Sequence, residues 1–124
     1  MKGNPIVWFE IYVQDMDRAK RFYEAVFQAT LQKLPSPFAD LELWSFPGDR
    51  NSYGASGALV KMKGAASGGN SAIVYFHCDD CAVEESRVPD AGGKVERSKM
   101  PIGEYGHISL VLDTEGNMIG LHSM

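Results

Sequence analysis

The feature that most restricts the fold of this chain is a strand-like segment that leads directly into a helix and occurs twice. In the first copy, the strand-like residues 8–13 lead to Asp15, which is a suitable N-cap for the helix that follows. In the second copy, the strand-like residues 71–78 lead to Asp80 in the same role. The two caps are 65 positions apart, so the sequence predicts an internal repeat of one structural unit.

Each copy is followed by segments typical of three short strands. These predicted strands comprise residues 31–34, 40–46 and 54–63 in the first half and residues 95–99, 107–113 and 117–123 in the second half. The sequence therefore predicts an α+β fold of two βαβββ modules, which form one curled mixed β-sheet with helices on the outside and a concave pocket. The first module comprises residues 7–63, the second comprises residues 71–123, and the Gly-rich linker comprises residues 64–70, all within the single domain 1–124.

The alternation of the first strand separates an apolar face from a mixed face. The apolar face is expected to pack on the helix, and it consists of Phe9, Ile11 and Val13. The opposite face carries Trp8, Glu10 and Tyr12. Aromatic rings beside a single carboxylate are typical of a small-molecule pocket, so we expect this face to line the concave side of the sheet.

Composition excludes several classes of protein. The chain has 124 residues and a net charge of −4, so it lacks the basic surface that nucleic-acid binding requires. No apolar run approaches the ~20 residues that span a membrane, and the N-terminal residues do not form a signal peptide. The sequence therefore predicts a cytoplasmic protein without a nucleic-acid or membrane partner.

The combination of motifs resembles the vicinal oxygen chelate superfamily, also called the glyoxalase/bleomycin-resistance/dioxygenase superfamily. The segments that carry the resemblance are VQDMDRA at 13–19, FYE at 22–24, AGGKV at 91–95 and DTEGN at 113–117, with Ile119. The ending DTEGNMIGLHS is similar to the group described as related to lactoylglutathione lyase. The resemblance covers nearly the whole chain and implies the predicted fold, a small-molecule ligand or substrate, and a homodimer.

The resemblance also implies four metal-ligand positions, and this chain departs from the pattern at all of them. Three of the positions correspond to Trp8, Ile73 and Gly120, whose side chains cannot bind a divalent metal. The fourth position lies within residues 54–63, which contain no His, Cys, Asp or Glu. We therefore expect a site without a metal or other cofactor, in which metal-dependent superfamily chemistry is lost.

The same alternation predicts which residues line the concave pocket. The expected ligand-binding residues are Trp8, Tyr12, Ile73, Tyr75, Tyr105, Met118, Gly120 and His122. Tyr105 ends a Gly-containing loop that is either a lid over the pocket or a plain connection.

Glu10 and His77 are the candidate catalytic residues of this pocket. The alternative for Glu10 is a structural carboxylate that accepts a hydrogen bond from a neighbouring tyrosine. A further alternative joins Glu10, His77 and His122 in a displaced metal site.

Three functions follow from these residues and from the resemblance. The first is a glyoxalase-like protein that binds or transforms a small apolar or aromatic molecule in a metal-free aromatic pocket. The second is a metal-dependent lyase or isomerase related to lactoylglutathione lyase. The third is a non-catalytic, bleomycin-resistance-like protein that sequesters an antibiotic. The sequence leaves open whether the chain is an enzyme.

The two cysteines form a C-x-x-C pattern at the start of the second helix, which is the spacing of redox pairs. Cys78 shares the alternation of the apolar residues in its strand, and two aspartates separate it from Cys81. A buried thiol beside carboxylates is a poor thiolate, so we expect Cys78 to belong to the core.

Overall fold

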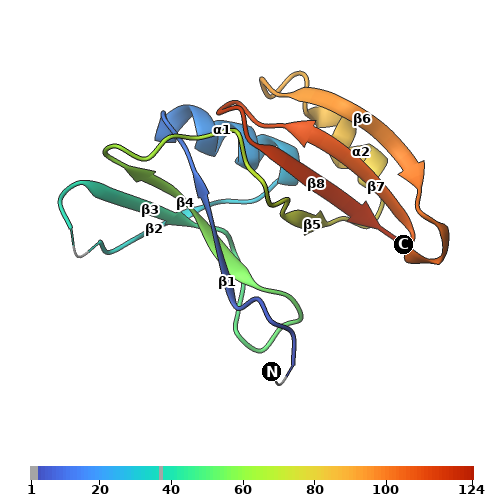
Figure 1. Cartoon of the computed structure of the whole chain (residues 1–124), viewed down its shortest axis with the longest axis horizontal. Coiled ribbons are helices and arrows are strands. Elements are labelled where there is room, and N and C mark those ends of the chain that lie inside the picture. Colours follow the sequence, from blue (N-terminus) through green and yellow to red (C-terminus); the bar gives the residue numbers. More distant parts are fainter. Residues whose placement is uncertain (1–2, 37) are drawn as a thin grey trace.

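The computed structural model describes residues 3–36 and 38–124, and within these residues it contains eight strands, two α-helices and one 3-10 turn (Figure 1). The first half consists of β1 (Trp8–Tyr12), α1 (Met16–Phe27), β2 (Gln32–Leu34), β3 (Leu41–Ser45) and β4 (Ser56–Met62). The second half consists of β5 (Tyr75–His77), α2 (Cys81–Arg87), β6 (Lys94–Pro101), the 3-10 turn (Gly103–Tyr105), β7 (His107–Leu112) and β8 (Met118–Ser123). The predicted order of strand, helix and three strands is present in both halves.

The strands of the two halves form sheets of the same topology. Their orders are β1-β4-β3-β2 and β5-β8-β7-β6, with β1 parallel to β4 and β5 parallel to β8. The remaining neighbours are antiparallel. The predicted α+β fold of two βαβββ modules is confirmed. The strands hydrogen-bond as two four-stranded sheets rather than as one continuous sheet, because β1 and β5 each end their own sheet.

The residues that precede the helices explain where the helices begin. The Asp15 carboxylate accepts a hydrogen bond from the main-chain N–H of Arg18 at 3.0 Å. The Asp80 carboxylate accepts one from the N–H of Ala82, also at 3.0 Å. Each carboxylate satisfies a main-chain donor that has no partner within the helix, as both caps were predicted to do.

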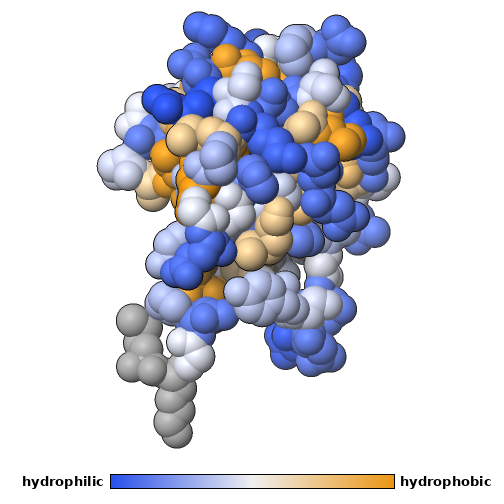
Figure 2. Space-filling view, turned by 90° about the vertical axis from the view of Figure 1, so that its right-hand side faces the viewer, coloured by the Kyte–Doolittle hydropathy of each residue, from blue (hydrophilic) through white to orange (hydrophobic). Residues whose placement is uncertain are grey.

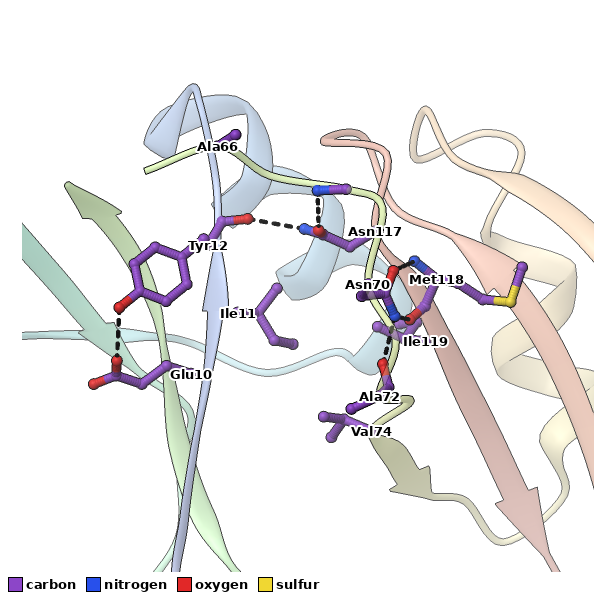
Figure 3. Close-up of a pocket in the computed structure, with 11 residues that line it drawn as sticks. Glu10, Ile11, Tyr12, Ala66, Asn70, Ala72, Val74, Asn117, Met118 and Ile119 are labelled. Atoms are coloured by element: carbon purple, nitrogen blue, oxygen red, sulfur yellow. Dashed lines mark hydrogen bonds between the residues drawn. The ribbon is translucent and has the colours of Figure 1, made fainter. Parts of the chain in front are cut away.

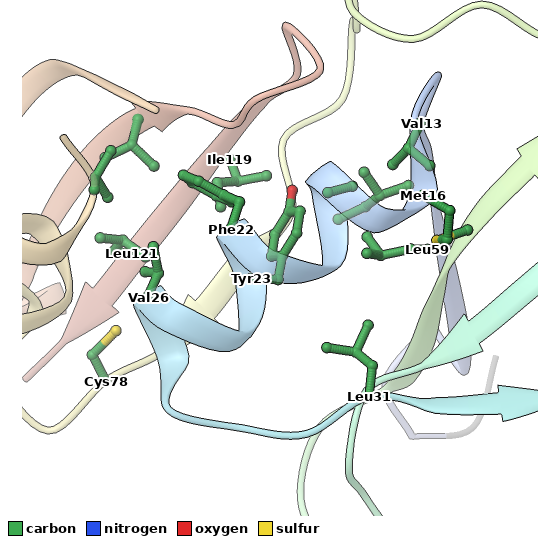
Figure 4. Packing of buried hydrophobic residues seen from close by; sticks show 14 of the residues in the cluster. Val13, Met16, Phe22, Tyr23, Val26, Leu31, Leu59, Cys78, Ile119 and Leu121 are labelled. Carbon is green, nitrogen blue, oxygen red and sulfur yellow. The ribbon is translucent and has the colours of Figure 1, made fainter. Parts of the chain in front are cut away.

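Helix α1 supplies the centre of a core to which both modules contribute (Figure 4). Phe22, Tyr23 and Val26 of α1 are completely buried, and Leu59 of the first sheet and Leu121 of the second belong to the same cluster. Aromatic rings extend this core across the modules, and these rings are Phe9, Phe27, Phe46 and Phe76 together with Tyr23. Because the two sheets share one apolar core, neither module buries its hydrophobic face alone.

Gly93 allows the segment between α2 and β6 to approach the core. A β-carbon at this position would collide with the Phe22 ring and lie 2.5 Å from the main-chain oxygen of Leu112. The main-chain oxygen cannot move as a side chain can. The glycine is therefore required by close packing of the segment after α2 against helix α1 and strand β7.

The surface is mixed rather than uniformly polar. On the side shown in Figure 2, hydrophobic residues form small separate patches among hydrophilic ones. The large apolar side chains exposed near the ends of β1 and β5 include Val7 at 82%, Trp8 at 42% and Tyr75 at 47% of their full exposure. Among the described residues, no helix has the length and apolar character that crossing a membrane requires.

Residues 113–117 connect β7 to β8, and we call them the Glu115 turn. The Glu115 side chain is fully buried and accepts hydrogen bonds from the main-chain N–H groups of Gln14 and Asp15, at 2.8 and 2.9 Å. The Arg18 guanidinium donates to the same carboxylate from Nε at 2.6 Å and from a terminal nitrogen at 2.9 Å. The turn therefore ties the second module to the first turn of α1.

Electrostatics at Glu115 favours the charged carboxylate despite its burial. Burial alone opposes ionisation, but the Arg18 guanidinium and the N–H groups of Asp15 and Gln14 outweigh it and lower the pKa of Glu115 to about 2. A second contact of the same turn is buried, because the Tyr23 hydroxyl donates to Asp113 at 2.7 Å. Burial and this neighbouring carboxylate raise the pKa of Tyr23 well above its usual value.

We predict that Glu115→Gln lowers the free energy of unfolding by about 2 kcal/mol at pH 7, because one oxygen becomes a donor and the charge that pairs with Arg18 is lost. The native carboxylate stabilises the fold above its ordinary pKa of 4.5, and this contribution is lost as the pH falls towards about 2. The difference in the free energy of unfolding between the native chain and Glu115→Gln should therefore become smaller as the pH falls from 4.5 towards about 2. Urea unfolding followed by circular dichroism measures it.

Glu104→Gln is the matched control, since Glu104 is exposed in the 3-10 turn. This variant should stay within about 0.5 kcal/mol of the native chain. A Glu115→Gln chain as stable as the native one at pH 7 would contradict the role assigned to the Glu115 turn.

Candidate functional site

The mixed face of β1 brings together the three residues that its alternation predicted, and we call it the Trp8 face. The indole Nε1 of Trp8 donates to Glu10 Oε2, and the Tyr12 hydroxyl donates to Glu10 Oε1, both at 3.2 Å. Residues two apart on a strand point to the same side, which explains the contact. Glu10 thus lies between two aromatic rings and accepts from both.

Tyr12 is a donor at this site. Partial burial, together with the Glu10 carboxylate that accepts from its hydroxyl, raises the pKa of Tyr12 above its usual value. The phenol therefore stays protonated near neutral pH and can donate to Glu10. The Glu10 carboxylate is the acceptor of the Trp8 face, and its oxygens retain unused lone pairs.

A hollow of about 210 Å³ lies beside the Trp8 face, between β1, the segment 66–74 and the beginning of β8 (Figure 3). Glu10, Tyr12 and Met118 line it, and these three were predicted to lie in the pocket. The other lining residues come from the segment 66–74, from Ile11, Asn117 and Ile119. Within the lining, Glu10 is the one charged side chain. The hollow is therefore largely apolar with one carboxylate.

Two asparagine side chains fix the walls of this hollow (Figure 3). Asn117 donates to the main-chain oxygen of Tyr12 at 2.9 Å and accepts from the N–H of Gly68 at 2.6 Å. Asn70 donates to the main-chain oxygen of Met118 at 3.1 Å and accepts from its N–H at 3.2 Å. Both amides are occupied by the main chain, so they hold the wall in place and offer little to a ligand.

The predicted linker is therefore part of the site. Sequence reasoning identified residues 64–70 by their Gly content and missed their contacts, because partners such as Asn117 are distant in the chain. The available signal was the DTEGN motif, which supplies Asn117. The hydroxyl of Ser67 also donates to the main-chain oxygen of Glu115 at 2.7 Å. The linker is thus bonded to the Glu115 turn.

Met118 is the one predicted site residue of the second module that lines the hollow. The others lie outside its lining, and they are Ile73, Tyr75, His77, Tyr105, Gly120 and His122. The Tyr75 ring covers Gly120 so closely that a β-carbon there would collide with it. His77 is 83% exposed and lies 3.8 Å from Asp79, whereas His122 Nε2 is 2.7 Å from the main-chain oxygen of Tyr105.

Two further predicted residues of the second module are exposed. Ile73 retains 40% of its full exposure and Tyr105 retains 67%. The ligand-binding or catalytic roles of the second-module residues stay predictions.

The donors proposed for a displaced metal site are divided between the two sheets. His77 and His122 are register partners on β5 and β8, while Glu10 lies on β1. In the described part of the chain, no group of three or more His, Cys, Asp or Glu side chains is arranged to hold a metal ion. The residues present do not fit the metal that the sequence resemblance implies.

Both cysteines belong to the interior. Cys78 is 3% exposed, Cys81 is fully buried, and both are free thiols. Burial, with a smaller contribution from the Glu84 carboxylate, raises the pKa of Cys78 to about 12. The prediction that Cys78 packs in the core is confirmed, and its thiol is a poor nucleophile.

Known proteins share this architecture. Residues 5–36 match the family model of the bleomycin resistance protein-like N-terminal region. Glyoxalase I from Zea mays is similar at 20% identity with a TM-score of 0.74, covering 96% of this chain and 46% of that one. A glyoxylase/bleomycin resistance protein/dioxygenase domain from Frankia sp. is similar at 14% identity with a TM-score of 0.71, covering 98% of each chain.

A third similar structure is the trypanothione-dependent glyoxalase I of Leishmania major, at 16% identity with a TM-score of 0.70, covering 98% of this chain and 87% of that one. The comparison with curated proteins finds no match. The chain spans less than half the length of the maize enzyme.

These likenesses show that the chain has the vicinal oxygen chelate fold, so the resemblance inferred from the sequence motifs is confirmed. At identities of this level the shared property is the fold, and the activity must be argued from the site.

We predict that Asn117→Ala lowers the free energy of unfolding by about 2 kcal/mol, and the melting temperature by about 8 °C, because main-chain groups of Tyr12 and Gly68 lose their partner. Differential scanning calorimetry measures the change. Asn51→Ala is the control, since Asn51 is exposed in a loop. Equal melting temperatures for the two variants would show that Asn117 does not support the wall.

Proposed function

We propose that this chain binds a small planar molecule, apolar or aromatic, against the Trp8 face and in the adjoining hollow. The observation that supports this most directly is the hydrogen-bonded group of Trp8, Glu10 and Tyr12 beside a hollow that Glu10 and Tyr12 line. Apolar surface with a few fixed polar groups is the usual character of a small-molecule site. In this proposal Trp8 and Tyr12 contact the ligand by their rings and Glu10 fixes its orientation.

The proposed site works without a metal ion. The side chains of Trp8 and Ile73 have no metal-binding atom and Gly120 has no side chain, while His77 and Glu10 belong to different sheets. The structural relatives include proteins named glyoxalase I, and the matched family is named for bleomycin resistance. The first name is that of an enzyme and the second is that of a resistance protein, for which the sequence resemblance implies sequestration of a ligand. Ligand binding is common to both, and in a catalytic protein Glu10 would exchange a proton with the ligand, with His77 as the second candidate.

The proposal predicts that aromatic compounds raise the melting temperature and that Trp8→Leu weakens their binding about fivefold, since the indole face is lost. A thermal-shift screen identifies the compounds, and calorimetric titration measures the affinities. Tyr53→Leu removes an aromatic ring that is 97% exposed, and it should leave the affinities unchanged. Addition of a chelator should also leave them unchanged. If Trp8→Leu binds as well as the native chain, the ligand lies elsewhere.

Recovery of the bound compound then separates the two classes. An unchanged compound indicates sequestration, whereas a new product that is absent with Glu10→Gln indicates catalysis at this carboxylate. Either outcome is compatible with the binding proposal.

We also propose that the chain forms a homodimer through the edge of β1 before Tyr12, whose own main-chain oxygen already accepts from Asn117. The Val13 N–H donates to Val60 on β4, so the main-chain groups of Glu10 and Trp8 point away from β4. An open edge flanked by exposed Val7 favours pairing with a second copy. Light scattering should give twice the chain mass of 13.6 kDa. Val7→Lys should shift the equilibrium towards the monomer, and a monomer at every concentration would contradict the pairing.

A further inference from the structure

The chain contains two pairs of tryptophan and glutamate with the same local arrangement. Trp8 and Glu10 are two residues apart on β1, and Trp44 and Glu42 are two residues apart on β3. In each pair the indole Nε1 donates to the carboxylate Oε2, at 3.2 Å and 2.8 Å respectively. Each pair thus places an aromatic π-face next to a carboxylate that the indole itself holds in position.

The Trp44 pair already contacts a cation. The Lys20 ammonium lies 3.3 Å from the centre of the Trp44 ring. An ammonium over an indole is attracted to the negative face of the ring, and a nearby carboxylate adds a second favourable term. Lys20 extends from α1, so the helix-covered face of the first sheet supplies its own cation.

The Trp8 pair lies on the opposite face of that sheet and has a different environment. Among the described residues, one cationic side chain lies over an aromatic ring, and that contact is between Lys20 and Trp44. In this part of the chain, no Lys or Arg lies over the Trp8 ring. The Trp8 side has Tyr12 instead, which donates a second hydrogen bond to Glu10. Trp8 is 42% exposed, so its ring is accessible to a molecule from solution.

This region also offers a ligand a charged hydrogen-bond acceptor but no charged donor. The amides of Asn70 and Asn117 are occupied by the main chain, and no Lys or Arg lines the hollow. The Glu10 carboxylate keeps lone pairs beyond those used by Trp8 and Tyr12. A ligand that brings N–H donors and a positive charge satisfies this arrangement, whereas an anion meets only repulsion.

We propose that the Trp8 face takes an organic ammonium ion whose apolar or aromatic body occupies the adjoining hollow. The inference rests on the proposed small-molecule function and names the chemical class of its ligand. The ammonium donates hydrogen bonds to Glu10 and lies against the Trp8 ring, as Lys20 lies against Trp44. The body of the ligand packs on the apolar lining, which includes Ile11 and Ile119.

Three probes of nearly equal size test the charge preference: phenethylamine, phenethyl alcohol and phenylacetate. They share one aromatic ring and differ in carrying a positive, neutral or negative group near pH 7. We expect the ammonium to bind about tenfold more tightly than the alcohol, and the carboxylate to bind most weakly. Raised ionic strength should reduce the preference. Calorimetric titration of the native chain gives all three affinities.

Glu10→Gln and Glu42→Gln form a matched pair of variants. Glu10→Gln should abolish the tenfold preference while the alcohol still binds, and Glu42→Gln should retain the preference. In a Trp44→Phe background, Trp8 is the remaining tryptophan, and quenching of its fluorescence reports binding at this ring. Melting curves identify any variant that does not fold, and the titrations of the native chain do not depend on the variants.

The outcomes separate this inference from the function on which it rests. If the three probes bind equally, or if phenylacetate binds best, the ammonium inference is wrong while small-molecule binding stands. If Glu10→Gln leaves the preference intact, the charge is recognised elsewhere and the inference is also wrong. If none of the probes binds and the wider aromatic screen shifts no melting temperature, the proposed function itself fails.

Discussion

The buried carboxylate of Glu115 is the interaction on which the arrangement of the two modules depends. It accepts from the N–H groups of Gln14 and Asp15 and pairs with the Arg18 guanidinium. These donors belong to the first turn of α1 and the residue before its cap, so one side chain from the second module fixes the start of the central helix. This buried charge is stable because both oxygens of the carboxylate accept hydrogen bonds, including those from a positively charged guanidinium.

The position of the candidate site follows from this contact between the Glu115 turn and the start of α1. The sheets do not hydrogen-bond to each other at β1 and β5, so their separation is set by the shared core and by the Glu115 turn. Asn117 of the same turn bonds to Tyr12 and Gly68, which places the end of β1 and the linker at a fixed distance. The hollow beside the Trp8 face is the space that remains between them.

Sequence reasoning succeeded where the determinants are local. Alternation in residues 8–12 predicted the grouping of Trp8, Glu10 and Tyr12, and the capping aspartates predicted the helix starts. The contacts of Glu115 were not predicted, because its partners lie about 100 positions earlier and leave no periodic signal. For the same reason, the linker was identified by composition while its place in the wall of the site was missed. Periodicity also cannot show whether two sheets join at their edges.

The two halves share one topology, but they differ in the segments that form the contact between them. In the second half, β7 and β8 are connected by the short turn that carries Glu115, while the corresponding connection between β3 and β4 is a longer, exposed loop. The second half contributes the turn, and the first half contributes the start of α1, which donates hydrogen bonds to it. Two copies of the first half would have the arginine without its carboxylate, and two copies of the second would have the carboxylate without its arginine. The two halves are therefore complementary at this contact and cannot be exchanged.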